Sequence, residues 1–148
     1  MKNNFAEEYA RDMAIHNAYD AARDANDEAG KEKARADHKE FDNDLMLKGN
    51  SYCRLYDLYK LARDAGNEYI DFSDVIWDKD VPAKIESLRE LGIEKFTFSS
   101  TWSSAVETAW LFLQNGCSLE GLVQINSRFN KFMSEERERI PAYLFAVN

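Results

Sequence analysis

Residues 96–110 read FTFSSTWSSAVETAW, and this stretch decides the fold that we expect. Its first part alternates apolar and polar residues, which is typical of a strand, and its last part opens an amphipathic helix over residues 104–115. Gly116 is placed to end that helix, and a second apolar segment covers residues 119–126. Strand, helix and strand with short connections predict a βαβ crossover with parallel strands and a right-handed connection.

Apolar segments on both sides extend this unit into a domain. Residues 50–66 predict a helix with a broad apolar face, residues 69–72 a short strand, and residues 80–92 a helix that Asp80 caps. The terminal stretch AYLFAV adds a strand, and the charged segment before it, which ends at Pro141, is typical of a loop or short helix. The sequence therefore predicts an α+β fold, with a small β-sheet in the C-terminal half and helices packed on it.

Residues 1–47 predict a long, charged helical arm in front of an α+β domain that we place at residues 48–148. An apolar stripe at helical spacing begins at Phe5 and thins into alanines, and Gly30 is expected to interrupt the helix. Residues 31–44 are almost wholly polar, so they form a solvated helix, a linker, or a segment that a partner orders.

Composition narrows the class of partner. The chain has 148 residues and a net charge of −8, which disfavours direct nucleic-acid binding because phosphate contacts need clustered Lys and Arg. The charged N-terminus and the lack of a long apolar run predict no signal peptide and no membrane span, and hence a cytoplasmic protein. Cys53 and Cys117 are far apart in sequence, so we expect two free thiols and no cofactor. This charge favours a basic protein surface as partner.

Five hydroxyl residues lie between positions 99 and 104, where an anion-binding loop or a nucleophile elbow would be placed. Both motifs need glycine, and the sequence has none between Gly92 and Gly116. Ser104 and Glu107 have the spacing of a capping box, which assigns this serine a structural role. We therefore expect a helix cap and no catalysis. We interpret the rest of the turn as a contact surface, formed by Ser99, Ser100, Thr101 and Ser103 around an exposed Trp102.

Acidic and aromatic residues alternate over residues 71–80. Negative charge beside apolar anchors suits docking on a basic, groove-like protein surface. The aspartates of this segment also suit the N-caps of successive helices, and both interpretations stay open. The residues that we assign to partner binding are Asp71, Asp74, Trp77, Asp78, Asp80 and Trp102.

Two further sets of residues at helical spacing could form a metal site or a face that stacks on nucleic-acid bases. Asp12, His16 and Asp20 share one helix face, but a metal held by one helix would be open to water and would lack supporting groups, so we expect no metal there. The tyrosine row in residues 52–59 has no basic neighbourhood, so we expect it in the core and not as a stacking face for bases.

The strings GIEKFTFSSTWSSAVETAW, LEGLVQINSRF and PAYLF resemble a group of small uncharacterised proteins of Firmicutes, their phages and their conjugative elements. The resemblance covers residues 85–148, and it implies a genetic setting but no activity and no catalytic residues. Small acidic proteins of mobile elements are often inhibitors or adaptors of host defence. The chain resembles anti-CRISPR proteins in this general character.

We therefore expect a non-enzymatic protein that blocks a basic, nucleic-acid-handling partner, with a CRISPR effector as the most specific candidate. The alternative is a small ligand-binding or enzymatic domain that uses the turn at residues 99–104, because ligands in open α/β sheets collect beyond the carboxyl ends of strands. A third class is a homo-oligomer joined through the N-terminal helix.

Overall fold

A computed structural model of the chain describes residues 5–73 and 78–148. These residues form two compact units, a helical one at Phe5–Tyr56 and a mixed one of helices and strands at Asp57–Asn148. Helix α3 (Asn50–Ala65) carries the boundary between the units, and the helix predicted for this segment is confirmed. Among the described residues, no helix combines the length and the apolar character that a membrane crossing requires.

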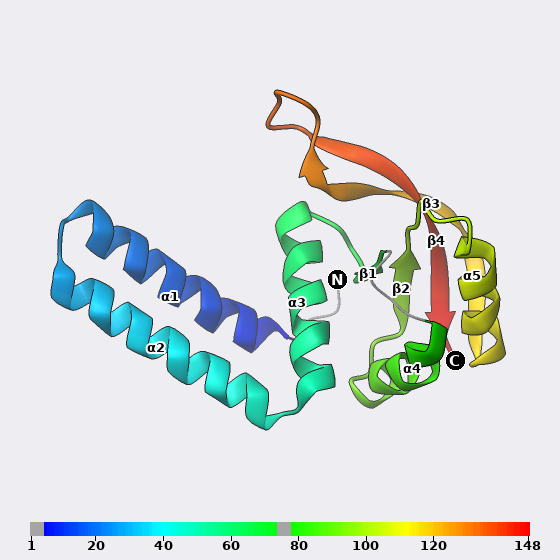
Figure 1. The fold of residues 1–148 in the computed structure, drawn as a ribbon, viewed down its shortest axis with the longest axis horizontal. Helices are drawn as coiled ribbons and strands as arrows, with labels where there is room; N and C mark the ends of the chain where they lie inside the picture. The colour runs from blue at the N-terminus through cyan, green and yellow to red at the C-terminus, as the bar shows by residue number, and fades with distance from the viewer. Residues whose placement is uncertain (1–4, 74–77) are drawn as a thin grey trace. The chain divides into compact units, whose positions relative to one another are not determined.

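In the helical unit, α1 (Ala6–Asp24) and α2 (Glu28–Leu47) form an antiparallel hairpin, drawn in blue and cyan in Figure 1. The prediction that Gly30 interrupts the helix is wrong, because Asp27 caps α2 and Gly30 lies in its first turn, where its N–H donates to Asp27 Oδ1 at 3.0 Å. A Cβ at Gly30 would lie 2.5 Å from Asp27 Oδ2 and 2.9 Å from Ala22 Cβ. Glycine therefore permits a close approach here and does not break the helix.

The hairpin has a small core because both helices are rich in alanine and in charged residues. Rings from Phe5 and Phe41 each meet Tyr56 edge to face, with centroids 5.9 Å and 5.8 Å apart. Residues 31–44 are helical within α2, which is the first of the three interpretations that the sequence left open. The buried residues of the two helices are Asp12, Ala22, Ala34, Phe41 and Leu45.

In the mixed unit, four strands of the described residues form one sheet in the order β1-β2-β4-β3. β1 is parallel to β2, and β4 is antiparallel to both β2 and β3. β2 and β3 therefore run in the same direction, as the predicted βαβ-like unit requires, but β4 lies between them. The α+β fold is confirmed. The strands are β1 (Asp71–Phe72), β2 (Lys95–Phe98), β3 (Cys117–Asn130) and β4 (Arg137–Val147).

The segment expected to be a charged loop or short helix is mostly strand. β3 and β4 extend through it as a long hairpin, and Arg137 Nη1 donates to the carbonyl oxygens of Ser127 and Arg128 at 3.2 Å and 3.0 Å. Pro141 lies inside β4 opposite Gln124. β2 pairs with a later part of β4, so a proline is tolerated at this position although it donates no hydrogen bond.

Helices α4 (Val81–Glu90) and α5 (Ala105–Gln114) pack on one face of the sheet around a cluster of phenylalanines. The Phe112 ring lies 5.0 Å from Phe96 and 5.2 Å from Phe98, centroid to centroid. Successive side chains of a strand point to opposite faces, so Thr97 and Ser99 point away from this core. That alternation brings the polar residues of β2 to the face where the candidate site lies.

Candidate functional site

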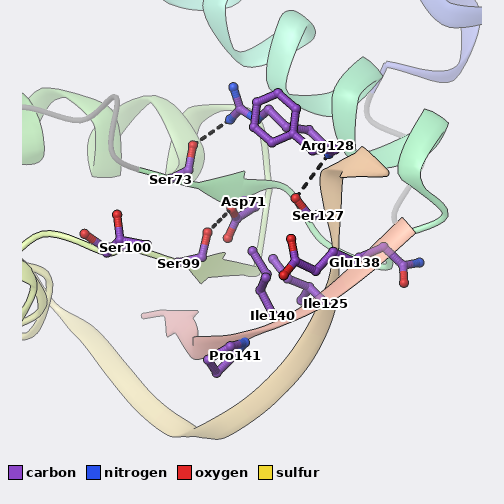
Figure 2. A pocket seen from close by; sticks show the side chains of 13 residues that line it. Asp71, Ser73, Ser99, Ser100, Ile125, Ser127, Arg128, Glu138, Ile140 and Pro141 are labelled. Carbon is purple, nitrogen blue, oxygen red and sulfur yellow. Dashed lines mark hydrogen bonds between the residues drawn. The ribbon is translucent and has the colours of Figure 1, made fainter. Parts of the chain in front are cut away.

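A pocket of about 550 Å³ opens at the carboxyl ends of the parallel strands β1 and β2 (Figure 2). Ligands of open α/β sheets collect at such ends. Polar groups from the ends of β1, β2 and β3 surround it, and an apolar wall comes from the β3–β4 hairpin. The lining residues that carry the argument are Asp71, Ser73, Ser99, Ser100, Thr101 and Arg128, with Ile125, Ile140 and Glu138 on the hairpin side.

Asp71 is the central group of the pocket. It lies opposite Thr97 in the parallel register of β1 and β2, so its side chain shares a sheet face with Thr97 and Ser99. Its carboxylate accepts hydrogen bonds from Thr97 Oγ1 at 2.7 Å and Ser99 Oγ at 2.6 Å. Burial raises the pKa of Asp71, and these two hydrogen bonds and the charge of Arg128 only partly oppose that rise. A carboxyl group with a raised pKa in a pocket is a candidate functional group.

Arg128 brings a positive charge to the same pocket. Its Nη2 donates to Ser73 Oγ at 2.6 Å, and its side chain is exposed (Figure 2). Glu138 on β4 adds a second carboxylate to the lining. The site therefore offers both signs of charge and several hydroxyl groups, which suits a small polar ligand better than a bare phosphate.

Among the described residues, the pocket lining includes no histidine that could activate a serine nucleophile. Ser99 donates its hydroxyl hydrogen to Asp71, and both histidines of the chain lie in α1 and α2. A serine nucleophile is normally activated by a base that a third group orients. The arrangement of Asp71 and Ser99 can hold a ligand or a proton, and it has no oriented histidine behind it.

The residues predicted as a contact turn divide between two places. Ser99, Ser100 and Thr101 line the pocket, whereas Ser103 is exposed outside its lining. Ser100 Oγ accepts a hydrogen bond from the Trp102 N–H at 3.1 Å, which fixes the bend of the turn. The predicted exposure of Trp102 is confirmed, because 50% of this residue is accessible to solvent.

The predicted capping box at the start of α5 is wrong. Among the described residues, Ser104 makes no side-chain hydrogen bond to the first turn of the helix, and Glu107 is exposed. The backbone angles of Ser104, φ −79° and ψ 3°, differ from the extended values at which an N-cap hydroxyl can accept from the first helical turn. The first turn of α5 is held by a different contact. Thr108 Oγ1 donates to Asp78 Oδ1 at 2.8 Å, which joins α5 to the short 3-10 helix η1 (Asp78–Asp80).

The acidic residues predicted to bind a partner have separate positions. Asp71 lies in the pocket, Asp78 is exposed and bonded to Thr108, and Asp80 occupies the N-cap position of α4. No side-chain capping bond from Asp80 is present in the described part of the chain. Asp74 and Trp77 lie outside the described residues. The structure therefore brings Asp71 together with the hydroxyl turn, which the sequence does not predict.

The outer face of α5 is an unexpected apolar surface. Val106, Trp110 and Leu113 lie at spacings of four and three, which places them on one face of the helix. They are 72%, 59% and 39% exposed, whereas Phe112 on the opposite side is fully buried. We call these three residues together with Trp102 the α5 face. Glu107 is the charged residue of α5.

Several site residues have only weak signals in the sequence. α5 is apolar on most sides, so periodicity alone does not tell which side is covered. Arg128 and Glu138 belong to the hairpin that was expected to be a loop. The alternation of LVQINSRF continues through residue 129, and it was the available sign that β3 extends to the pocket.

Metal-ligating side chains gather in the helical unit. Asp12, His16 and His38 each offer one ligand atom, and these atoms lie within 4.8 Å of one another. The third residue of the row considered in the sequence, Asp20, pairs with Arg23 at 3.3 Å. The cluster therefore differs from the single-helix row, because its third member comes from α2.

The chain belongs to the family described as Domain of unknown function (DUF7698), whose model matches residues 54–147. No curated protein and no solved structure matches the chain. The expected resemblance to an uncharacterised family is confirmed at this level. The matched span contains the pocket and the α5 face, whereas α1 and α2 lie outside it.

Proposed function

We propose that this DUF7698 protein is a non-enzymatic binding protein, an inhibitor or adaptor, whose main contact surface is the α5 face. The observation that supports the proposal is the exposure of Val106 and Trp110, which lie one helical turn apart on α5, with an exposed Trp102 in the turn before the helix. Contiguous large apolar side chains on a surface mark interaction sites, and tryptophan is enriched among the residues that dominate binding energy.

The partner in this proposal is a basic protein with an apolar groove. The chain has a net charge of −8, and Glu107 places a carboxylate on the helix that carries the α5 face. Opposite charge speeds encounter and makes association sensitive to salt. Asp78 and Asp80 stay in the proposal as part of the acidic rim.

The proposed class of partner is argued from the charge of the chain and from its sequence resemblance. A nucleic-acid-handling protein fits the charge, and a CRISPR effector is the most specific candidate for a chain that resembles proteins of mobile elements. A cytoplasmic location belongs to the same proposal. The non-enzymatic part is supported by Ser99, whose hydroxyl donates to Asp71 and has no histidine beside it among the described residues that line the pocket.

Site-specific photocross-linking tests this function. A photoreactive phenylalanine analogue is placed at Trp110, and a control copy carries it at Phe132, which is 93% exposed on the β3–β4 hairpin. The experiment uses host lysate at low and high salt, after light scattering has established the mass of the protein in solution. We expect a cross-link to one basic protein from position 110, weaker at high salt and absent from position 132.

Two outcomes would contradict the proposal. Equal labelling from both positions would mean that exposure alone drives the cross-link. A cross-link to a second copy of the chain, together with a dimeric mass, would assign the α5 face to self-association.

A second candidate function is the binding of a small polar ligand in the pocket. The observation that favours it is the joint presence of Asp71, Arg128 and the hydroxyl turn around about 550 Å³ of open volume. Titration with phosphate, nucleotides and neutral polar fragments tests it through the backbone amide signals of Ser100 and Thr101. Ligand binding requires shifts that Arg128→Gln removes, and silent amides with every probe would reject this function.

A further inference from the structure

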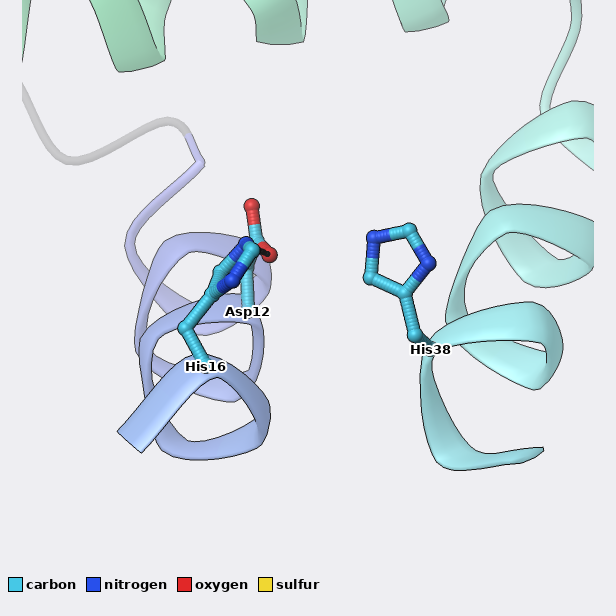
Figure 3. A group of neighbouring side chains, drawn as sticks. All are labelled: Asp12, His16 and His38. Atoms are coloured by element: carbon cyan, nitrogen blue, oxygen red, sulfur yellow. Dashed lines mark ion pairs between the residues drawn. The ribbon is translucent and has the colours of Figure 1, made fainter. Parts of the chain in front are cut away.

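The geometry points to a divalent transition-metal site in the α1–α2 hairpin, formed by Asp12, His16 and His38. Figure 3 shows the two side chains of α1 and the His38 ring of α2 turned toward the same space between the helices. Their ligand atoms lie within 4.8 Å of one another. The three ligands belong to the helical unit and lie outside the residues that the family model matches, and the inference does not depend on the function proposed above.

Two of the three ligands lie a few tenths of an ångström closer together than a metal would hold them. His16 Nε2 lies 3.1 Å from Asp12 Oδ1. Ligands bound at about 2.0–2.2 Å to one zinc ion in a tetrahedral arrangement lie roughly 3.3–3.6 Å apart. A small rotation of the His38 ring, which is joined to α2 by flexible side-chain torsions, would complete the set.

Neighbouring side chains hold the ligands in place, and such supporting groups were missing from the single-helix row considered in the sequence. The Tyr56 hydroxyl donates to the second oxygen of Asp12 at 2.6 Å, so the buried carboxylate keeps Oδ1 directed toward His16. His38 Nδ1 lies 3.3 Å from Asp42 Oδ2. That contact leaves Nε2 for the metal, and a histidine whose other nitrogen pairs with a carboxylate is the usual arrangement of metal-ligating histidines.

The ligand set selects the class of metal. Two imidazoles and one carboxylate suit zinc and iron-type divalent ions, whereas calcium and magnesium prefer oxygen ligands throughout. The His16 and His38 side chains are 49% and 45% exposed, so water can reach a fourth position. The hairpin buries little apolar surface, and a metal that joins α1 to α2 would supply cohesion that its alanine-rich core does not.

Zinc titration of the full chain, followed by NMR of the imidazole nitrogens, tests the site. The sequence has two histidines, so both rings are observed without overlap from others. We expect both to shift together and to saturate at one equivalent of zinc, and the melting temperature to rise. His38→Gln should weaken zinc binding by at least about tenfold and abolish the rise. Asp42→Asn should weaken it less, and Asp20→Asn, the matched exposed control on α1, should leave it unchanged.

Circular dichroism of each variant confirms that the helices remain folded. If the imidazole signals do not move when zinc is added, the site is overturned. This holds even if zinc binds elsewhere, for example through the cysteines. A shift of one ring alone would overturn it as well. Weaker zinc binding in Asp20→Asn with unchanged binding in His38→Gln would place the metal on the row of α1 and reject the contribution of α2.

Discussion

Replacing the exposed side chains of the α5 face should remove binding and leave folding nearly intact. The perturbation is the double variant Val106→Gln and Trp110→Gln. Glutamine retains helix propensity, so the backbone of α5 is kept. If the α5 face exists for a partner, its side chains contribute little to the stability of the free protein.

The expected cost follows from the exposed fractions. Trp110 is 59% exposed, so at roughly 200 Å² per buried tryptophan and about 25 cal/mol per Å² its buried part contributes about 2 kcal/mol. Glutamine keeps some of that contact, which lowers the cost to roughly 1 kcal/mol. Val106 is 72% exposed and adds a few tenths of a kcal/mol at most, roughly offset by the better helix propensity of glutamine.

Phe112→Ala on the same helix is the matched comparison. Its ring is fully buried among four other phenylalanines, and such truncations cost about 3–5 kcal/mol. Urea unfolding followed by circular dichroism measures both variants, and an unchanged slope confirms that the unfolded states are comparable. If the double variant loses as much stability as Phe112→Ala, the outer side chains are packed and the α5 face is not a free surface.

Three further predictions concern the interior. Burial raises the pKa of Asp71 above its value in the unfolded chain, so the folded protein retains a proton that the unfolded chain has lost between the two pKa values. Stability from this group therefore falls as pH rises through that window, and Asp71→Asn should flatten the fall in urea titrations, whereas an unaltered profile would contradict the assignment. Tyr56→Phe removes the hydroxyl that donates to buried Asp12 and should cost about 1–3 kcal/mol, and a neutral result in the same assay would show that the contact is dispensable. Gly116→Ala should cost about 1–2 kcal/mol in thermal unfolding, because φ is +88° and the new Cβ would lie 2.6 Å from Arg89 Nη2; an unchanged melting temperature would be the contrary result.

The local elements were predictable because their signals are local. The helix of residues 50–66 and the alternation of residues 96–98 follow from spacing within the segment, and the structure confirms both. The insertion of β4 between β2 and β3 was not predictable in this way. It pairs Phe96 with Phe145, residues that are distant in sequence, and no short-range pattern specifies that contact.

The candidate site was partly predictable for the same reason. The hydroxyl-rich turn at residues 99–104 could be recognised in the sequence directly. Its relevance to ligand binding follows from the general rule that ligands of open sheets bind beyond the carboxyl ends of strands. Its partner Asp71 was assigned to a protein contact because an aspartate after alternating apolar residues gives no sign of being buried. Likewise the row of Asp12, His16 and Asp20 did not include His38, since the antiparallel pairing of α1 and α2 that brings His38 to His16 is tertiary structure.

The stretch FTFSSTWSSAVETAW serves three surfaces, and the alternation of β2 separates them. Phe96 and Phe98 point into the phenylalanine core, so Ser99 must point to the other face, where it meets Asp71 and opens the pocket. The chain then bends through the hydroxyl turn, and the helical period takes over. Phe112 returns to the core, and Trp110 is left outside. A one-residue shift in this segment would turn the pocket side chains into the core and the core side chains into the pocket. Because the pocket and the α5 face use different side chains, a ligand and a partner could bind neighbouring residues without competing.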